Sequence, residues 1–101
     1  MYDMTNLTRM AALGKAAPAA MAAFQALDKA ALADGAIPVK YKELIALGVA
    51  LTTQCPYCLA LHSKAAVAAG ATPEELAEAT FIAVALRAGA ALTHGTHLMP
   101  P

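Results

Sequence analysis

Charged residues are few in this chain, and their signs balance. Of the 101 residues, 14% are charged, with seven Lys and Arg against seven Asp and Glu. Disorder is not expected, because disordered chains are rich in charge and poor in apolar residues. A nucleic-acid-binding surface is not expected either, because binding to phosphates requires a basic excess or a basic stripe. The chain length predicts a single domain over residues 1–101.

β-Branched residues and cysteines are also scarce. Valine, isoleucine and threonine together number 15, against 28 alanines and 13 leucines, so the composition favours helices over a β-sandwich or barrel. The two cysteines are too few for a disulfide scaffold. A pair spaced as Cys-x-x-Cys, in a chain without a secretion signal, indicates redox or metal chemistry instead.

The sequence also lacks a recognisable secretion signal and an uninterrupted membrane-spanning segment. Residues 1–4 contain neither a basic region nor an apolar run, so we expect a cytoplasmic protein. The longest stretch free of Asp, Glu, Lys and Arg covers residues 44–63, which is long enough to cross a membrane. Its middle is polar and is broken by Pro56, so we expect no membrane-spanning segment and no membrane partner.

Apolar residues, in contrast, are abundant. They make up 59% of the chain, which together with the glycines exceeds the roughly 45–50% of ordinary globular domains. A monomer of this size buries only about two-thirds of the surface that its unfolded chain exposes. We therefore expect contacts between subunits to cover the surplus apolar helix faces, in a homo-oligomer.

Prolines, glycines and capping residues divide the chain into about five helices. Pro18, Pro38 and Pro56 suit first helical positions, Thr5 is a candidate cap, and Thr72 begins a capping box. The predicted helices cover residues 6–13, 18–33, 38–53, 56–70 and 73 to about 95. The predicted fold class is all-α, in a single compact helical domain.

The segment Cys55-Pro-Tyr-Cys58-Leu-Ala-Leu-His62 contains the chemically informative residues. With Cys55 as the N-cap, helical spacing places Cys55, Cys58 and His62 on one stripe, within about 60° of one another. The two sulfurs then lie near enough for a disulfide, and the positive end of the helix dipole favours thiolate. His62 can reach the sulfur of Cys58, four residues earlier, as a base or hydrogen-bond partner. This arrangement suits a reactive dithiol.

Two other interpretations of the cysteines remain open. A buried cysteine often behaves as a small inert hydrophobe. A zinc site would need further ligands, and His94 and His97 could complete a Cys2His2 set. Otherwise these two histidines form a solvated helix end. Redox chemistry is favoured over both, because two cysteines open a helix and a histidine follows four residues after the second.

Glu43 is the remaining candidate, twelve residues before Cys55 and followed by an apolar run. Spacing alone favours a solvated glutamate that pairs with Lys40 or Lys42. In an antiparallel helix pair, Glu43 would lie about 16 Å before the turn and His62 about 9 Å after it. Spacing therefore does not guarantee a direct contact, which a bridging water or an adjoining subunit could replace.

Glu43, eleven intervening residues, and Cys55-x-x-Cys58-x-x-x-His62 resemble the signature of alkylhydroperoxidase D-like proteins, which belong to the carboxymuconolactone decarboxylase-like superfamily. Residues 64–75 are also similar to this core, and the resemblance covers about residues 13–95. It implies an all-α fold whose active site opens at the start of the Cys-x-x-Cys helix. It also implies no metal or organic cofactor, and assembly as a homotrimer or homohexamer.

The activity that this resemblance implies is that of a thiol-dependent peroxidase or disulfide reductase, with an antioxidant role. Cys58 would attack a hydroperoxide and become a sulfenic acid. Cys55 would donate a proton and then form the disulfide, while His62, assisted by Glu43, would relay protons. A lipoyl-bearing or thioredoxin-like dithiol protein would then reduce the disulfide.

Two features depart from the family's pattern. The chain lacks the additional helical half of longer alkylhydroperoxidases, and Tyr57 stands where the best-known members place a histidine. The helix dipole favours Cys55 as the attacking residue, whereas the later histidine and the family favour Cys58, which we prefer. The alternative functions are a carboxymuconolactone decarboxylase-type lyase and a non-catalytic zinc-binding or assembly module.

Overall fold

A computed structural model describes residues 2–101, and every regular element in this range is a helix. The elements, with η for a 3₁₀ helix, are η1 (Met4–Arg9), α1 (Met10–Ala16), α2 (Pro18–Leu32), α3 (Val39–Thr53), α4 (Pro56–Ala68), α5 (Pro73–His94) and η2 (Gly95–Leu98). The prediction of an all-α fold with about five helices is confirmed.

The N-terminal caps of α4 and α5 form as predicted. Cys55 is the N-cap of α4, and its sulfur accepts the backbone N–H of Cys58 at 3.3 Å. At the start of α5, Thr72 Oγ1 accepts the N–H of Glu75 at 3.1 Å, and the Glu75 carboxylate accepts the N–H of Thr72 at 3.0 Å. This reciprocal capping box satisfies two backbone donors that a helix end otherwise leaves free.

The beginning of the chain differs from the prediction. Asp3, and not Thr5, caps the first turn, because its carboxylate accepts the N–H of Thr5 at 2.9 Å. The helix also continues through Gly14, where we expected it to end, and stops at Ala16. The following proline explains this end point, since a proline disfavours the helical conformation of the residue before it. Ala17 accordingly has φ −136° and ψ 69°.

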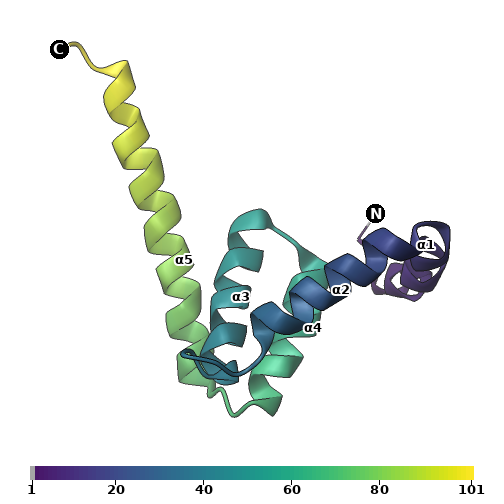
Figure 1. The fold of residues 1–101 in the computed structure, drawn as a ribbon. Helices are drawn as coiled ribbons and strands as arrows, with labels where there is room; N and C mark the ends of the chain where they lie inside the picture. Colours follow the sequence, from purple (N-terminus) through teal and green to yellow (C-terminus); the bar gives the residue numbers. More distant parts are fainter. Residues whose placement is uncertain (1) are drawn as a thin grey trace.

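The core of the molecule lies between α3, α4 and α5 (Figure 1). Helices α3 and α4 form an antiparallel pair, joined by a turn in which Gln54 adopts the left-handed conformation with φ 55°. Leu47, Ala66 and Ala71 are buried at the centre, and Leu44, Leu59 and Leu76 pack against them. The core is small, because most of its buried side chains are alanines.

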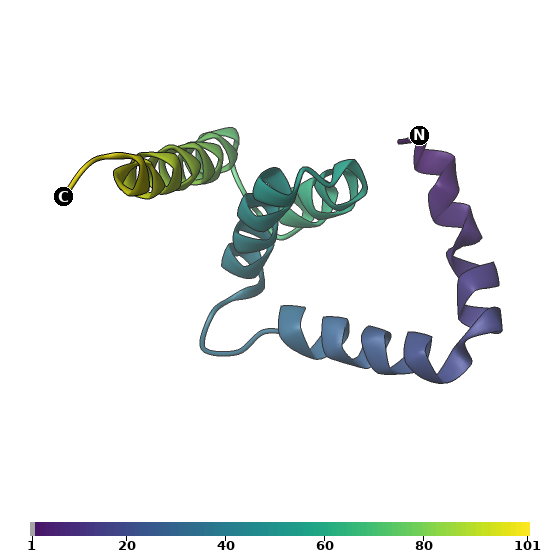
Figure 2. The same ribbon diagram turned by 90° about the horizontal axis from the view of Figure 1, so that it is seen from above.

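The segment η1–α1–α2 forms an arm that leaves this core before α3 and returns towards α4 (Figure 2). At its tip, the Asn6 side chain donates to the hydroxyl of Tyr57 at 3.1 Å. The rings of Tyr2 and Tyr57 also meet edge to face, with centroids 5.9 Å apart. The N-terminal end of the arm therefore contacts the residue that lies between the two cysteines.

Much apolar surface is exposed in the single chain. The radius of gyration is 17.0 Å, whereas a compact domain of this length has about 13 Å. On α2, Phe24 is exposed by 54% and Leu27 by 67%. The outer part of α5 projects beyond α3 (Figure 1). Leu92 near its end is exposed, and so is Phe81 on the part of α5 that lies along α3.

The segment Pro73–Leu98, which comprises α5 and η2, is long and apolar enough to cross a membrane. One such helix is weak evidence for a membrane, because helices of other kinds of protein meet the same criterion of length and composition. Residues 44–63, the longest stretch without Asp, Glu, Lys or Arg, form parts of α3 and α4 with the turn between them.

The capping box gives a direct test of the fold. We expect Thr72→Ala to lower the free energy of unfolding by about 1 kcal/mol, because it removes the acceptor for a helix-start N–H. The corresponding fall in the melting temperature is about 5 °C for a domain of this size. The matched control is Thr80→Ala, which removes an exposed threonine from the middle of α5. Equal losses in thermal melts of the two variants would contradict this role of Thr72.

Candidate active site at the start of α4

Cys55 lies at the junction of two helices and serves both. Its N–H donates to the carbonyl of Ala50 at 3.1 Å, which closes the end of α3. Its side chain caps α4, and Pro56 follows at the first helical position, where a missing N–H costs nothing. The sequence predicts this arrangement because it depends only on neighbouring residues.

The two cysteines are free thiols whose sulfurs share a hydrogen bond at 2.6 Å. That bond, together with the backbone N–H of Cys58, lowers the pKa of Cys55 below its usual value. The same sulfur–sulfur bond raises the pKa of Cys58, and burial of this thiol raises it further. The first proton therefore leaves Cys55, and Cys58 keeps the proton that it shares with the Cys55 thiolate.

Glu43 is buried, with 6% of its surface exposed, and its Oε2 lies 2.6 Å from Nδ1 of His62. The prediction of a solvated Glu43 paired with a lysine is therefore wrong. The lysines bind elsewhere: Lys40 forms an ion pair with Glu75 at 3.0 Å, and Lys42 donates to the carbonyl of Ala33. The contact between Glu43 and His62 is direct and lies within one chain, with no need of a bridging water or a second subunit.

The carboxylate of Glu43 fixes the orientation of the His62 ring. When Nδ1–H donates to Glu43, the other ring nitrogen, Nε2, is left as an acceptor. His62 lies one helical turn after Cys58 on α4, on the same side of the helix. The pair is thus a proton-accepting unit on the cysteine stripe.

His94 and His97 do not join this site. Their rings lie edge to face at 5.9 Å, around the C-terminal end of α5. Across residues 2–101, no three His, Cys, Asp or Glu side chains gather in a way that could hold a metal ion. The Cys2His2 set considered from the sequence therefore does not form within one chain.

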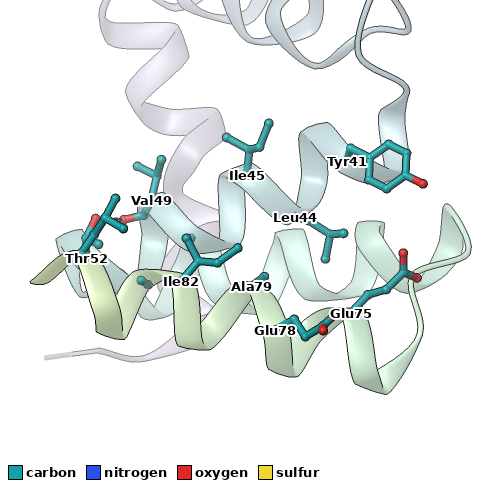
Figure 3. A pocket seen from close by; sticks show the side chains of 12 residues that line it. Tyr41, Leu44, Ile45, Val49, Thr52, Glu75, Glu78, Ala79 and Ile82 are labelled. Carbon is teal, nitrogen blue, oxygen red and sulfur yellow. Dashed lines mark hydrogen bonds between the residues drawn. The ribbon is translucent and has the colours of Figure 1, made fainter.

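A large apolar groove lies elsewhere, between α3 and α5 (Figure 3). It has a volume of about 610 Å³, and none of its lining residues is a cysteine or a histidine. The sequence did not predict this groove. Ile45 and Val49 are the sequence feature that could have indicated it, because they widen the apolar face of α3 beyond what one neighbouring helix can cover.

In the sequence, Tyr57 stands out only because the resembling family has a histidine at this position. The structure brings it together with Tyr2 and Asn6, which lie more than fifty residues earlier. No sequence signal pointed to this contact, because it depends on the path of the whole arm.

Fold and site together define an all-α protein with a helix-capping cysteine pair and a buried carboxylate–imidazole pair. Comparison with known families agrees with this description. The model of the carboxymuconolactone decarboxylase family matches residues 18–99, and the chain belongs to this family.

Relatives and solved structures cover most of the chain. A Paracoccus denitrificans protein, described as uncharacterized protein 4 in the cox locus, is 44% identical over 97 residues, which are 93% of this chain and 87% of the relative. A crystal structure of a carboxymuconolactone decarboxylase family protein from Legionella pneumophila matches with a TM-score of 0.77 and 40% identity, over 89% of this chain and 80% of that one. A Methanobacterium thermoautotrophicum protein structure matches with a TM-score of 0.80 and 28% identity, over 85% and 97%.

The opposite pKa shifts of the two cysteines predict a two-step titration of the thiols. One thiolate should form below the usual thiol pKa and the second above it, because the first charge is stabilised by the remaining S–H. Thiolate absorbance measured against pH checks this. In Cys58→Ala the shared bond is lost, so the pKa of Cys55 should rise towards its usual value. A single step near that value in the unmodified protein would contradict the assignment.

Proposed function

We propose that the protein is a thiol-dependent peroxidase or disulfide reductase that cycles between the Cys55–Cys58 dithiol and its disulfide. The observation that carries this proposal is the pair of sulfurs 2.6 Å apart on the helix that also holds His62 against the buried Glu43. A thiolate nucleophile, a resolving thiol and an oriented base are the groups that such chemistry requires.

The first step moves a proton between the sulfurs. In the resting dithiol, the lower pKa belongs to Cys55 and the higher pKa to Cys58. Transfer of the Cys58 proton to Cys55 along their hydrogen bond turns Cys58 into the thiolate. Cys55 then holds a proton that it can donate, so the pKa order is compatible with Cys58 as the attacking residue.

The Cys58 thiolate next attacks the terminal oxygen of a hydroperoxide, ROOH. The O–O bond breaks, Cys58 becomes a sulfenic acid, and the leaving alkoxide takes the proton of Cys55 to give the alcohol ROH. The Cys55 thiolate then attacks the sulfenic sulfur and forms the disulfide. Hydroxide leaves, and Nε2 of His62 returns to it the proton that it took from the dithiol when the first thiolate formed, which gives water.

Glu43 acts here as a positioning residue. It holds Nδ1 of His62 and stabilises the positive charge on the ring whenever Nε2 carries a proton. No metal or organic cofactor takes part in these steps.

A dithiol protein, lipoyl-bearing or thioredoxin-like, returns the two electrons by thiol–disulfide exchange. A reducing compartment such as the cytoplasm suits this cycle, because its thiol systems keep such a reductant reduced.

Single cysteine variants test the assignment. With a stoichiometric hydroperoxide, Cys55→Ser should accumulate a sulfenic acid on Cys58, because the resolving thiol is gone. Cys58→Ser should form no disulfide and show no turnover. Mass spectrometry after trapping with a sulfenic-acid reagent measures both.

In the unmodified protein, the same reaction should consume both thiols and join Cys55 to Cys58. Two thiols that persist under peroxide in the native state would overturn the proposal. A trapped sulfenic acid on Cys55 in Cys58→Ser would reverse the two roles while keeping the cycle.

Replacement of the buried carboxylate tests the relay. We expect Glu43→Gln to slow disulfide formation by about 10- to 100-fold, because a neutral amide no longer stabilises a protonated His62. Glu74→Gln, at an exposed glutamate at the start of α5, is the matched control. Rates of thiol loss against pH, together with circular dichroism of both variants, separate a proton-relay effect from a loss of folding.

The family name keeps one alternative open, a lyase of the carboxymuconolactone decarboxylase type. Such a reaction uses acid–base groups, here Glu43 and His62, and does not need the cysteines. Lyase activity that is undiminished in the Cys55→Ser/Cys58→Ser double variant would favour this alternative over the redox proposal.

A further inference from the structure

The apolar groove between α3 and α5 is lined along its length by Leu44, Ile45, Val49, Ile82 and Leu86 (Figure 3). Ile82 is exposed by 62%, and Ile45, Val49 and Leu86 are exposed by 54%, 56% and 67%. One end of the groove carries Tyr41 and the acidic Glu75 and Glu78. The opposite face of α3 holds the buried Glu43, so the groove is separate from the dithiol site.

We propose that this groove is occupied by the apolar face of α2 from a second copy of the same chain. Phe24, Leu27 and Ala31 form a stripe on α2 at helical spacing, and all three are exposed in the single chain. A helix of 15 residues is about 22 Å long, which is enough to follow the groove from the Tyr41 end to the Thr52 end.

The exposed surface supports an occupant of this size. The accessible surface of the chain is 7524 Å², whereas a folded monomer of 10.3 kDa has about 5,400 Å². The excess is about 2,100 Å² per chain, against about 800 Å² that each partner buries in a standard interface. The chain therefore has enough surplus surface for two neighbours, as in the homotrimer or homohexamer expected from the sequence.

The chain's own α2 is held away from the groove at both ends. After α2, the connection is braced by Lys42, which donates to the carbonyl of Ala33, and by Asp34, which accepts the N–H of Val39 at 2.9 Å. Before α2, the tip of the arm is fixed on Tyr57 by Asn6. While these contacts persist, only the α2 of another copy can enter.

Charge gives the direction of the incoming helix. Lys29 lies about 200° from Leu27 around α2, so it stays on the solvent side, whereas Asp28 lies within about 60° of Phe24 and Ala31. The end of the groove that carries Glu75 and Glu78 therefore disfavours the C-terminal end of α2 and suits the positive N-terminal end of that helix. The helix then runs parallel to α3 and α5, and Leu27 lies over Ile82.

Paired cysteines identify the occupant. In a Cys55→Ser/Cys58→Ser background, which removes the native thiols, Leu27→Cys combined with Ile82→Cys should form covalent dimers and larger species on mild oxidation. The matched control replaces Leu27→Cys by Gln25→Cys, about 200° away around α2. This control should give several-fold less cross-linked product on denaturing gels.

Three outcomes would overturn the proposal. A cross-linked monomer would assign the groove to the chain's own α2, and equal cross-linking in the control would reflect random collision. Recovery of the protein as a monomer bound to phosphatidylcholine vesicles would assign α5 to a lipid surface.

Light scattering supplies a measurement that does not depend on engineered thiols. Leu27→Glu should lower the assembled mass in detergent-free buffer, because a charge would have to enter the groove. Gln25→Glu should leave the mass unchanged. A stable, dilute monomer of the unmodified chain would overturn the proposal, whatever the result of the peroxide experiments.

Discussion

The contact between Glu43 and His62 is the interaction on which the rest of the structure depends. Glu43 has only 6% of its surface exposed. Burying a carboxylate in this way costs free energy unless a hydrogen-bonding or charged partner compensates the lost hydration. The imidazole 2.6 Å away provides that partner and ties α3 to α4. Because the two residues lie on different helices, the contact fixes how the start of α4 is presented. The same contact therefore joins α3 to α4 in the core and aligns His62 in the site.

Cys55 adds a second, local constraint at the same place. Its backbone closes α3 and its sulfur caps α4, so the residue cannot move without loosening both helix ends. The opposite pKa shifts of Cys55 and Cys58 follow from this geometry, since a capping sulfur receives hydrogen bonds and the thiol inside the first turn supplies one. The capping of α4 and the opposite pKa shifts of the two thiols therefore arise from one arrangement.

Helix α3 presents two different faces. One face buries Glu43, Leu47 and Ala50, and the other forms the floor of the groove against α5. The small alanine-rich core covers the first face, and the second stays open in the single chain. The composition that first suggested a surplus of apolar surface thus corresponds to particular surfaces, on α2 and in the groove.

The sequence by itself determined the helices, the capping of α4 and α5, and the common stripe of Cys55, Cys58 and His62, because each depends on residues within one turn. The prediction of the first cap was wrong, because Asp3 accepts the N–H of Thr5 and the first turn therefore already begins at Met4. Only the tertiary structure decided that Glu43 meets His62 while Lys40 binds Glu75. Spacing gave the distance of each residue from the turn, but the contact also depends on how two helices are rotated and inclined against each other. That orientation is set by packing across the whole core, which no local pattern encodes.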